Sequence, residues 1–321
     1  MRRLILVLAL SVAGCGPAAA PDPGVKVIGG GGSSAGRFSL PRAAAWDPAG
    51  HLYVVDKSAR VQRFDAAGAF ELGWSTPACE KGRPAGLAWD PKGTLLVADT
   101  HYHRILRYSP EGKLLAEFGG EGTAPGQFIY PTGLALAADG TIFVSEFGGN
   151  DRVQVFTPEG KLLRAWGKYG DAEGEFKRPQ GLALRGERLY VADAANHRVQ
   201  VFTPEGGFIR AWEGVKYPYS VSIDDEGNAL VAEYGNHRVS KFSPEGSPLG
   251  SAGKAGSAPG DLSTPWGVVA AGAKIFVVDS GNHRIQVWPS SRLSSRPQAR
   301  PRRLSAESCK LPADSSPGGR R

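Results

Sequence analysis

Histidine, arginine and acidic side chains recur together in this sequence, and such side chains can bind metal ions or transfer protons. An arginine follows an acid by four to six residues in six places. A catalytic pair does not need six copies, so we interpret the pairs as charge-assisted hydrogen bonds that fix a loop, within one repeat or to its neighbour. The pairs are Asp56/Arg60, Asp99/Arg104, Glu146/Arg152, Asp193/Arg198, Glu233/Arg238 and Asp279/Arg284.

The spacing of the acids points to a repeat architecture. Successive acids lie 43, 47, 47, 40 and 46 residues apart, and six copies fill the chain from about residue 38 to 288. Periods of 20–50 residues are typical of solenoids and propellers. Units of this size with four short strands match a propeller blade, so the period favours a ring of six blades over a solenoid.

Each copy has the same order of strand and turn signals. A proline precedes a short apolar strand, a turn such as DPKG (90–93) follows, and a very apolar second strand such as RLYVAD (188–193) ends at the acid. A third, alternating strand and a turn such as TPEG (203–206) lead to a fourth strand. The sequence therefore predicts an all-β, six-bladed propeller of four-stranded antiparallel blades over residues 25–289.

The sixth copy ends at VWPSS without a fourth strand, whereas the segment VKVIGG (25–30) is similar to the fourth strands of other copies. We expect residues 25–30 to supply the outermost strand of the last blade. Such pairing would close the ring and remove an open edge of unpaired backbone groups.

The copies resemble the NHL repeat. The stretch RPQGLALRGERLYVADAANHRVQVFTPEG (178–206) follows its pattern of proline, GLA, LYVAD, NHR and PEG. The resemblance implies a six-bladed ring. It implies little about function, because such rings serve as enzymes, RNA readers and protein docks.

Four histidines occupy one repeat position, and Ala59 and Asp151 hold that position in the other two copies. Equivalent loops on separate blades diverge, so we interpret the histidines as structural and predict no metal site and no cofactor. The four are His103, His197, His237 and His283.

Two classes of enzyme that resemble this chain in ring architecture bind a metal ion on the axis of the propeller. The amidating lyases of NHL type hold zinc through histidines that follow the first-strand proline, and this chain has no histidine there. The lactone hydrolases hold an axial calcium, which needs several hard oxygen ligands. We therefore predict a non-catalytic binding scaffold, with a propeller enzyme of lyase or hydrolase type and an atypical site as the alternative, and a purely structural envelope component as a third class.

The residues that follow the prolines are nevertheless of interest, because first strands line the central channel of a propeller. They mix aromatic, amide and guanidinium groups that suit stacking and hydrogen bonding to a sugar, a peptide end or a carboxylate. The predicted ligand-binding residues at the channel mouth are Arg42, Thr132, Gln180, Tyr219 and Trp266.

The N-terminal residues predict export. MRR and LILVLAL are typical of a signal peptide (1–14), and VAGC ending at Cys15 resembles the lipobox of bacterial lipoproteins. We expect a lipid on Cys15, a tether over 15–24 and anchoring in the cell envelope, with the outer membrane favoured because Gly16 is not an aspartate.

The charge of the chain is unevenly distributed. The net charge is +7, but residues 289–321 contribute +6 and Arg2 and Arg3 contribute +2, which leaves −1 for residues 15–288. A near-neutral ring argues against nucleic acid, and we predict a disordered basic tail over 290–321. We also leave open a disulfide between Cys79 and Cys309.

The sequence thus predicts a monomer that docks an envelope protein or glycan. Its docking face is formed by the d–a and b–c loops, the connections between blades and between the second and third strands.

Overall fold

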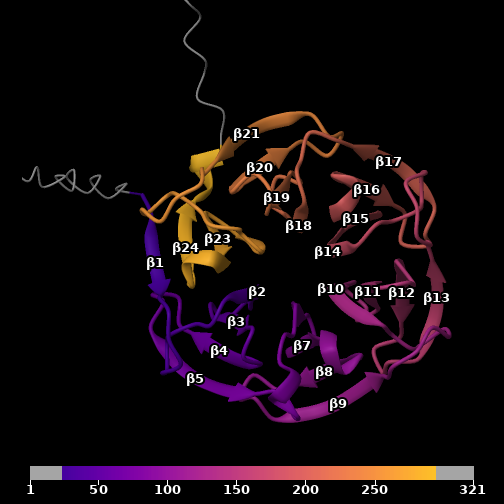
Figure 1. The fold of residues 1–321 in the computed structure, drawn as a ribbon, viewed down its shortest axis with the longest axis horizontal. Helices are drawn as coiled ribbons and strands as arrows, with labels where there is room; N and C mark the ends of the chain where they lie inside the picture. Colours follow the sequence, from indigo (N-terminus) through magenta and orange to yellow (C-terminus); the bar gives the residue numbers. More distant parts are fainter. Residues whose placement is uncertain (1–23, 294–321) are drawn as a thin grey trace, which may run out of the picture.

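The computed structural model describes residues 24–293, and these form one ring of six four-stranded sheets (Figure 1). This confirms the predicted all-β, six-bladed propeller. In blades one to three the strands, from the centre outwards, are β2 (Pro41–Trp46), β3 (Leu52–Asp56), β4 (Arg60–Phe64), β5 (Phe70–Ser75); β6 (Gly86–Asp90), β7 (Thr94–Asp99), β8 (Arg104–Tyr108), β9 (Leu114–Gly119); and β10 (Tyr130–Leu136), β11 (Ile142–Phe147), β12 (Arg152–Phe156), β13 (Leu162–Trp166).

The other three blades have the same antiparallel order. Their strands are β14 (Pro179–Arg185), β15 (Arg188–Asp193), β16 (Arg198–Phe202), β17 (Phe208–Trp212); β18 (Pro218–Ile223), β19 (Ala229–Glu233), β20 (Arg238–Phe242), β21 (Pro248–Ala252); and β22 (Gly267–Ala271), β23 (Lys274–Asp279), β24 (Arg284–Pro289), β1 (Lys26–Gly29).

Burial follows the radial position of each strand. All five residues of β3 are buried, because a second strand is covered by the neighbouring blade on each face. The outer strand β13 alternates between half-buried and exposed residues, because one of its faces meets water. The very apolar second strand is therefore the sequence signal of a position inside the blade, whereas the alternation in burial occurs in the outermost strand.

Neighbouring blades interlock through a glycine and an aromatic ring. Gly206, in the turn before β17, adopts φ +97°, and a Cβ at this position would lie 2.8 Å from the ring of Trp166 in the preceding blade. The same turn glycine meets Trp74, Phe118 and Trp212 at three other junctions between outer strands, and it meets Ile28 at the junction of β1 with β5. Glycine is needed there both for its left-handed backbone and for this close approach.

The ring is closed by its N-terminal strand. β1 pairs antiparallel with β24, with Lys26 opposite Val287 and Gly29 opposite Arg284. Ile28 of β1 is buried in the cluster that joins the last and first blades. The predicted closure by residues 25–30 is confirmed.

The C-terminal limit of the ring differs from the predicted boundary at residue 289. Ser290–Leu293 form the short 3-10 helix η5, and Leu293 is fully buried in the hydrophobic cluster between the fifth and sixth blades. The apolar side chain at this position continues the core beyond the proline at which we expected the strands to end. The rest of the predicted tail, the signal peptide, Cys15 and Cys309 lie outside the described residues, and Cys79 is exposed in η1 (Cys79–Lys81).

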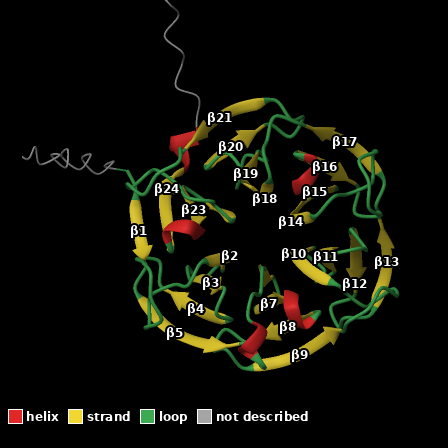
Figure 2. Cartoon of the chain, in the orientation of Figure 1, coloured by secondary structure: helices red, strands yellow, loops and turns green. Residues whose placement is uncertain are grey.

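Short helical turns follow three of the second strands at one face of the ring (Figure 2). They are η2 (Thr100–Tyr102), η3 (Ala194–Asn196) and η4 (Ser280–Asn282). No helix in residues 24–293 has the length and apolar character to cross a membrane.

Candidate functional site

The structure brings together all six acid–arginine pairs at the ends of the second strands. In blade four, Arg198 Nε lies 2.8 Å from Asp193 Oδ2, and the same carboxylate accepts hydrogen bonds from Asn196, Gln200 and the backbone N–H of Lys177. Because Lys177 belongs to the lead segment that enters the blade, the buried acid ties lead, loop and third strand together. The five other pairs join at 2.6 to 3.0 Å.

Blade two departs from this pattern. Asp99 Oδ2 accepts from Arg104 Nε at 3.0 Å, but the buried Asp99 Oδ1 has no hydrogen-bond partner among the described residues. Burial raises the pKa of Asp99 and outweighs the lowering effect of Arg104. The cause lies in the lead: in blade four the equivalent oxygen accepts the backbone N–H of Lys177, whereas the corresponding N–H of Gly82 donates to the carbonyl oxygen of Cys79 at 2.9 Å.

The repeated histidines connect each blade to the next. Nδ1 of His197 accepts the backbone N–H of Tyr217 at 3.1 Å, and Nδ1 of His283 accepts that of Leu40 at 3.1 Å across the seam. In blade three, Asp151 takes over this role and accepts from Arg178 N–H at 2.7 Å.

The backbone N–H groups that donate to these histidines and to Asp151 belong to residues that precede a proline and have positive φ, for example 49° at Leu40 and 45° at Tyr217. Residues before proline disfavour such conformations, so these positions are strained. The hydrogen bond from the neighbouring blade holds them in place.

Replacing His283 with alanine should lower the free energy of unfolding by about 1–2 kcal/mol, because the N–H of Leu40 loses its acceptor at the seam. Urea denaturation would measure the change. The matched control is His101→Ala, since His101 accepts no such bond from a neighbouring blade in residues 24–293. Equal losses in the two variants would contradict the assigned role.

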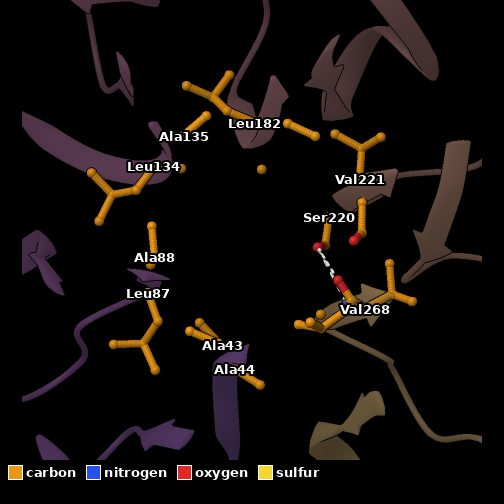
Figure 3. Close-up of a pocket in the computed structure, with 18 of the residues that line it drawn as sticks. Ala43, Ala44, Leu87, Ala88, Leu134, Ala135, Leu182, Ser220, Val221 and Val268 are labelled. Atoms are coloured by element: carbon orange, nitrogen blue, oxygen red, sulfur yellow. Dashed lines mark hydrogen bonds between the residues drawn. The ribbon is translucent and has the colours of Figure 1, made fainter. Parts of the chain in front are cut away.

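The inner strands surround a central cavity of about 340 Å³. Its wall is lined by small and apolar side chains, among them Ala44, Ala88 and Ala135 from the inner strands of successive blades (Figure 3). Ser220 links two inner strands there, because its hydroxyl accepts the N–H of Val268 at 3.2 Å. The wall has few groups that could bind a ligand by hydrogen bonds or charge. The polar side chains at the channel mouth are therefore the better candidates for a binding site.

The five residues predicted at the channel mouth all line this cavity. Three of them form a stacked group: the Trp266 and Tyr219 rings meet edge to face at 4.9 Å, and the guanidinium carbon of Arg42 lies 4.6 Å from the Trp266 ring centre. Tyr234 extends this group by stacking on Tyr219 at 4.6 Å. The mouth therefore has an aromatic side built by blades five and six.

The other two predicted residues differ in what they can offer a ligand. The hydroxyl of Thr132 is buried and donates to the carbonyl oxygen of Pro179 at 3.1 Å, so it is engaged within the protein. Gln180 is 3% exposed, and its Nε2 has no partner among the described residues; neither has Arg42 Nε. Two buried nitrogen donors at one mouth thus lack acceptors.

Sequence reasoning missed a second set of residues at the mouth. Arg83 and Arg178 precede the prolines of their blades, and His101 and Phe147 follow the acids by one or two positions. Together with Arg42 and others they line a cavity of about 270 Å³. Comparing the copies on both sides of each proline shows that the position before the proline varies as much as the one after it, but this variation alone does not show that the arginines face the channel.

Charge and burial alter proton affinities at this mouth. Burial lowers the pKa of Arg42 to about 10, and the positive charge of Arg83 acts in the same direction. Burial also lowers the pKa of His101, assisted by Arg83 and Arg42. In the part of the chain that the structure describes, no group of three or more His, Cys, Asp or Glu side chains is placed to hold a metal ion.

The NHL repeat family matches residues 176–202 and 262–288, which lie in the fourth and sixth copies. Among solved structures, a streptogramin B lyase is similar with a TM-score of 0.58 at 15% identity, over 85% of this chain and 89% of that chain. A gluconolactonase from Xanthomonas campestris has a TM-score of 0.61 at 17% identity, over 79% and 87%.

A protein of unknown function from Bacteroides thetaiotaomicron has a TM-score of 0.67 at 12% identity, over 83% of this chain and 75% of that chain. Identities this low show the fold alone. No curated protein matches the chain in sequence. The six closed sheets and these likenesses agree that the chain is a six-bladed β-propeller, and the family model identifies NHL repeats in its fourth and sixth copies.

Proposed function

We propose that this propeller is a non-catalytic binding scaffold and that its recognition surface is the channel mouth on the face of the d–a and b–c loops. The observation that carries the proposal is the stacked group of Arg42, Trp266 and Tyr219, beside buried donors that have no acceptor within residues 24–293. Rigid aromatic faces together with free donors are typical of ligand and glycan sites.

The partner that fits this surface is an envelope protein or a glycan. We propose, on the sequence, that residues 1–14 direct export and that a lipid on Cys15 anchors the monomer in the envelope, preferably at the outer membrane. The aromatic side of the mouth would then face polymers and proteins of the same compartment.

The double variant Tyr219→Ala/Trp266→Ala is expected to weaken capture of the partner at least tenfold, because central aromatic contacts dominate binding energy. Pull-down from an envelope extract and binding to immobilised envelope glycans would measure it. The matched control is Phe70→Ala/Leu163→Ala, which removes two exposed apolar side chains from outer strands. Capture that survives the first variant but not the control would place recognition on the outer strands.

A further inference from the structure

Three arginines converge on the cavity of about 270 Å³ at the channel mouth. Arg42 comes from β2, and Arg83 and Arg178 come from the leads that enter blades two and four. The guanidinium carbon of Arg42 lies 4.6 Å from the Trp266 ring centre, and that of Arg178 lies 5.9 Å from the Tyr219 ring centre. Residues far apart in the sequence thus place three positive charges around one space.

These three charges have no counter-charge in the structure. Among the described residues, none of those that line the cavity is acidic, and no salt bridge within residues 24–293 includes Arg42, Arg83 or Arg178. The repeat arginines, by contrast, each have an acid. Neighbouring like charges destabilise one another, so the cluster is suited to bind an anion.

The stacking leaves donors available. A guanidinium group that lies flat on an aromatic ring uses its face, while its N–H edge remains free for an oxyanion. Arg178 lies 4.8 Å from the Phe147 ring centre, and the Nε of Arg42 is buried without a partner among the described residues. Arg42 and Arg178 are therefore oriented before a ligand arrives, which reduces the entropy lost on binding.

Part of the site comes from blade two, whose lead is irregular. Blades one, three, four and six share a lead with the same parallel bridge, as between Glu121 and Phe128, whereas no such bridge occurs in the described leads of blades two and five. The lead of blade two instead presents Arg83, and the loop after β7 presents His101. Departures from an otherwise regular pattern are expected at functional sites, and here the departure coincides with the unpaired Asp99 Oδ1.

We propose that the channel mouth binds the phosphoryl group of a sugar phosphate, with the sugar ring against Trp266 and Tyr219. A phosphate monoester carries about −1.5 to −2 charges and three acceptor oxygens, which matches three guanidinium groups better than one carboxylate does. The inference rests on the proposed function, because it specifies the ligand of the same surface.

Calorimetric titration of the purified protein with glucose 6-phosphate, glucuronate and glucose tests the charge requirement. Glucose 6-phosphate is expected to bind at least about tenfold more tightly than glucuronate, and glucose is expected not to bind measurably, since charge-assisted hydrogen bonds supply most of the affinity. Equal affinity for glucose and glucose 6-phosphate, or no binding of the phosphate, would overturn the proposal.

Arginine variants test the location. Arg83→Gln and Arg178→Gln, both exposed positions, should each weaken glucose 6-phosphate binding at least about tenfold. Arg210→Gln in β17 removes the same charge from an outer strand and should change the affinity less than about twofold. An equal effect of Arg210→Gln would show general charge attraction and sink the site. If Tyr219→Ala/Trp266→Ala loses the envelope partner while the arginine variants bind glucose 6-phosphate normally, the proposed function stands and this inference fails.

Discussion

Replacing Asp193 with alanine is expected to lower the free energy of unfolding by about 3–5 kcal/mol, the range for breaking a buried ion pair. The loss arises because Arg198 keeps a largely buried charge without its acid, and because the backbone N–H of Lys177 and two amide side chains lose their acceptor. Burial raises the pKa of Asp193, and the hydrogen bonds from Asn196, Lys177 N–H and Arg198 oppose that rise. Urea denaturation followed by tryptophan fluorescence would measure the change.

Asp99→Ala is the matched control, since it removes the same side chain from the irregular blade. Arg104 would keep Glu117 at 3.1 Å and the carbonyl oxygen of Pro77 at 2.8 Å, so its charge would not be left unpaired. We expect a loss smaller by about 2 kcal/mol than at Asp193. Equal losses would show that the network around Asp193 adds nothing beyond the ion pair.

Replacing Gly86 with alanine is expected to cost about 3 kcal/mol or to prevent the ring from assembling. A Cβ built on Gly86 would lie 1.9 Å from the carbonyl oxygen of Thr132 in the next blade. That oxygen is part of the backbone of an inner strand and cannot move without shifting the strand. Thermal unfolding and the soluble yield of the variant would measure the effect.

Gly31→Ala serves as the control for Gly86→Ala. Its Cβ would meet the nearest atoms, in His283, at 3.8 Å, and its backbone does not need positive φ. The control should unfold within about 0.5 kcal/mol of the unchanged protein. If Gly86→Ala were equally mild, the inner strands would not be in the close contact that the structure gives them.

The fold could be predicted from the sequence because each blade repeats the same local signals. The proline, the apolar second strand and the turn glycines recur in register, so errors in one copy are corrected by the others. Residues 25–30 could be assigned to the last blade for the same reason. The short helix Ser290–Leu293 was not predicted, because one apolar residue after Pro289 carries no periodic signal.

The candidate site was harder to predict from the sequence than the fold. The residues after the prolines were identified, but Arg83 and Arg178 were not, because nothing in the sequence shows that a residue before proline adopts positive φ and turns towards the axis. The same backbone geometry explains why the inter-blade bond of His283 to Leu40 could not be foreseen. Periodicity reports which face of a strand is buried, whereas these contacts depend on how two loops from different blades meet.

The strand that closes the ring has a consequence for the order of synthesis. β1 precedes every other described strand along the chain, and its partner β24 follows all of them. At 5–20 residues per second, β1 emerges from the ribosome on the order of ten to fifty seconds before its partner exists. During translation this segment, with Ile28 at its centre, must stay unpaired or be shielded by a chaperone, and the nascent chain can complete its last sheet only after nearly all of the protein has been made.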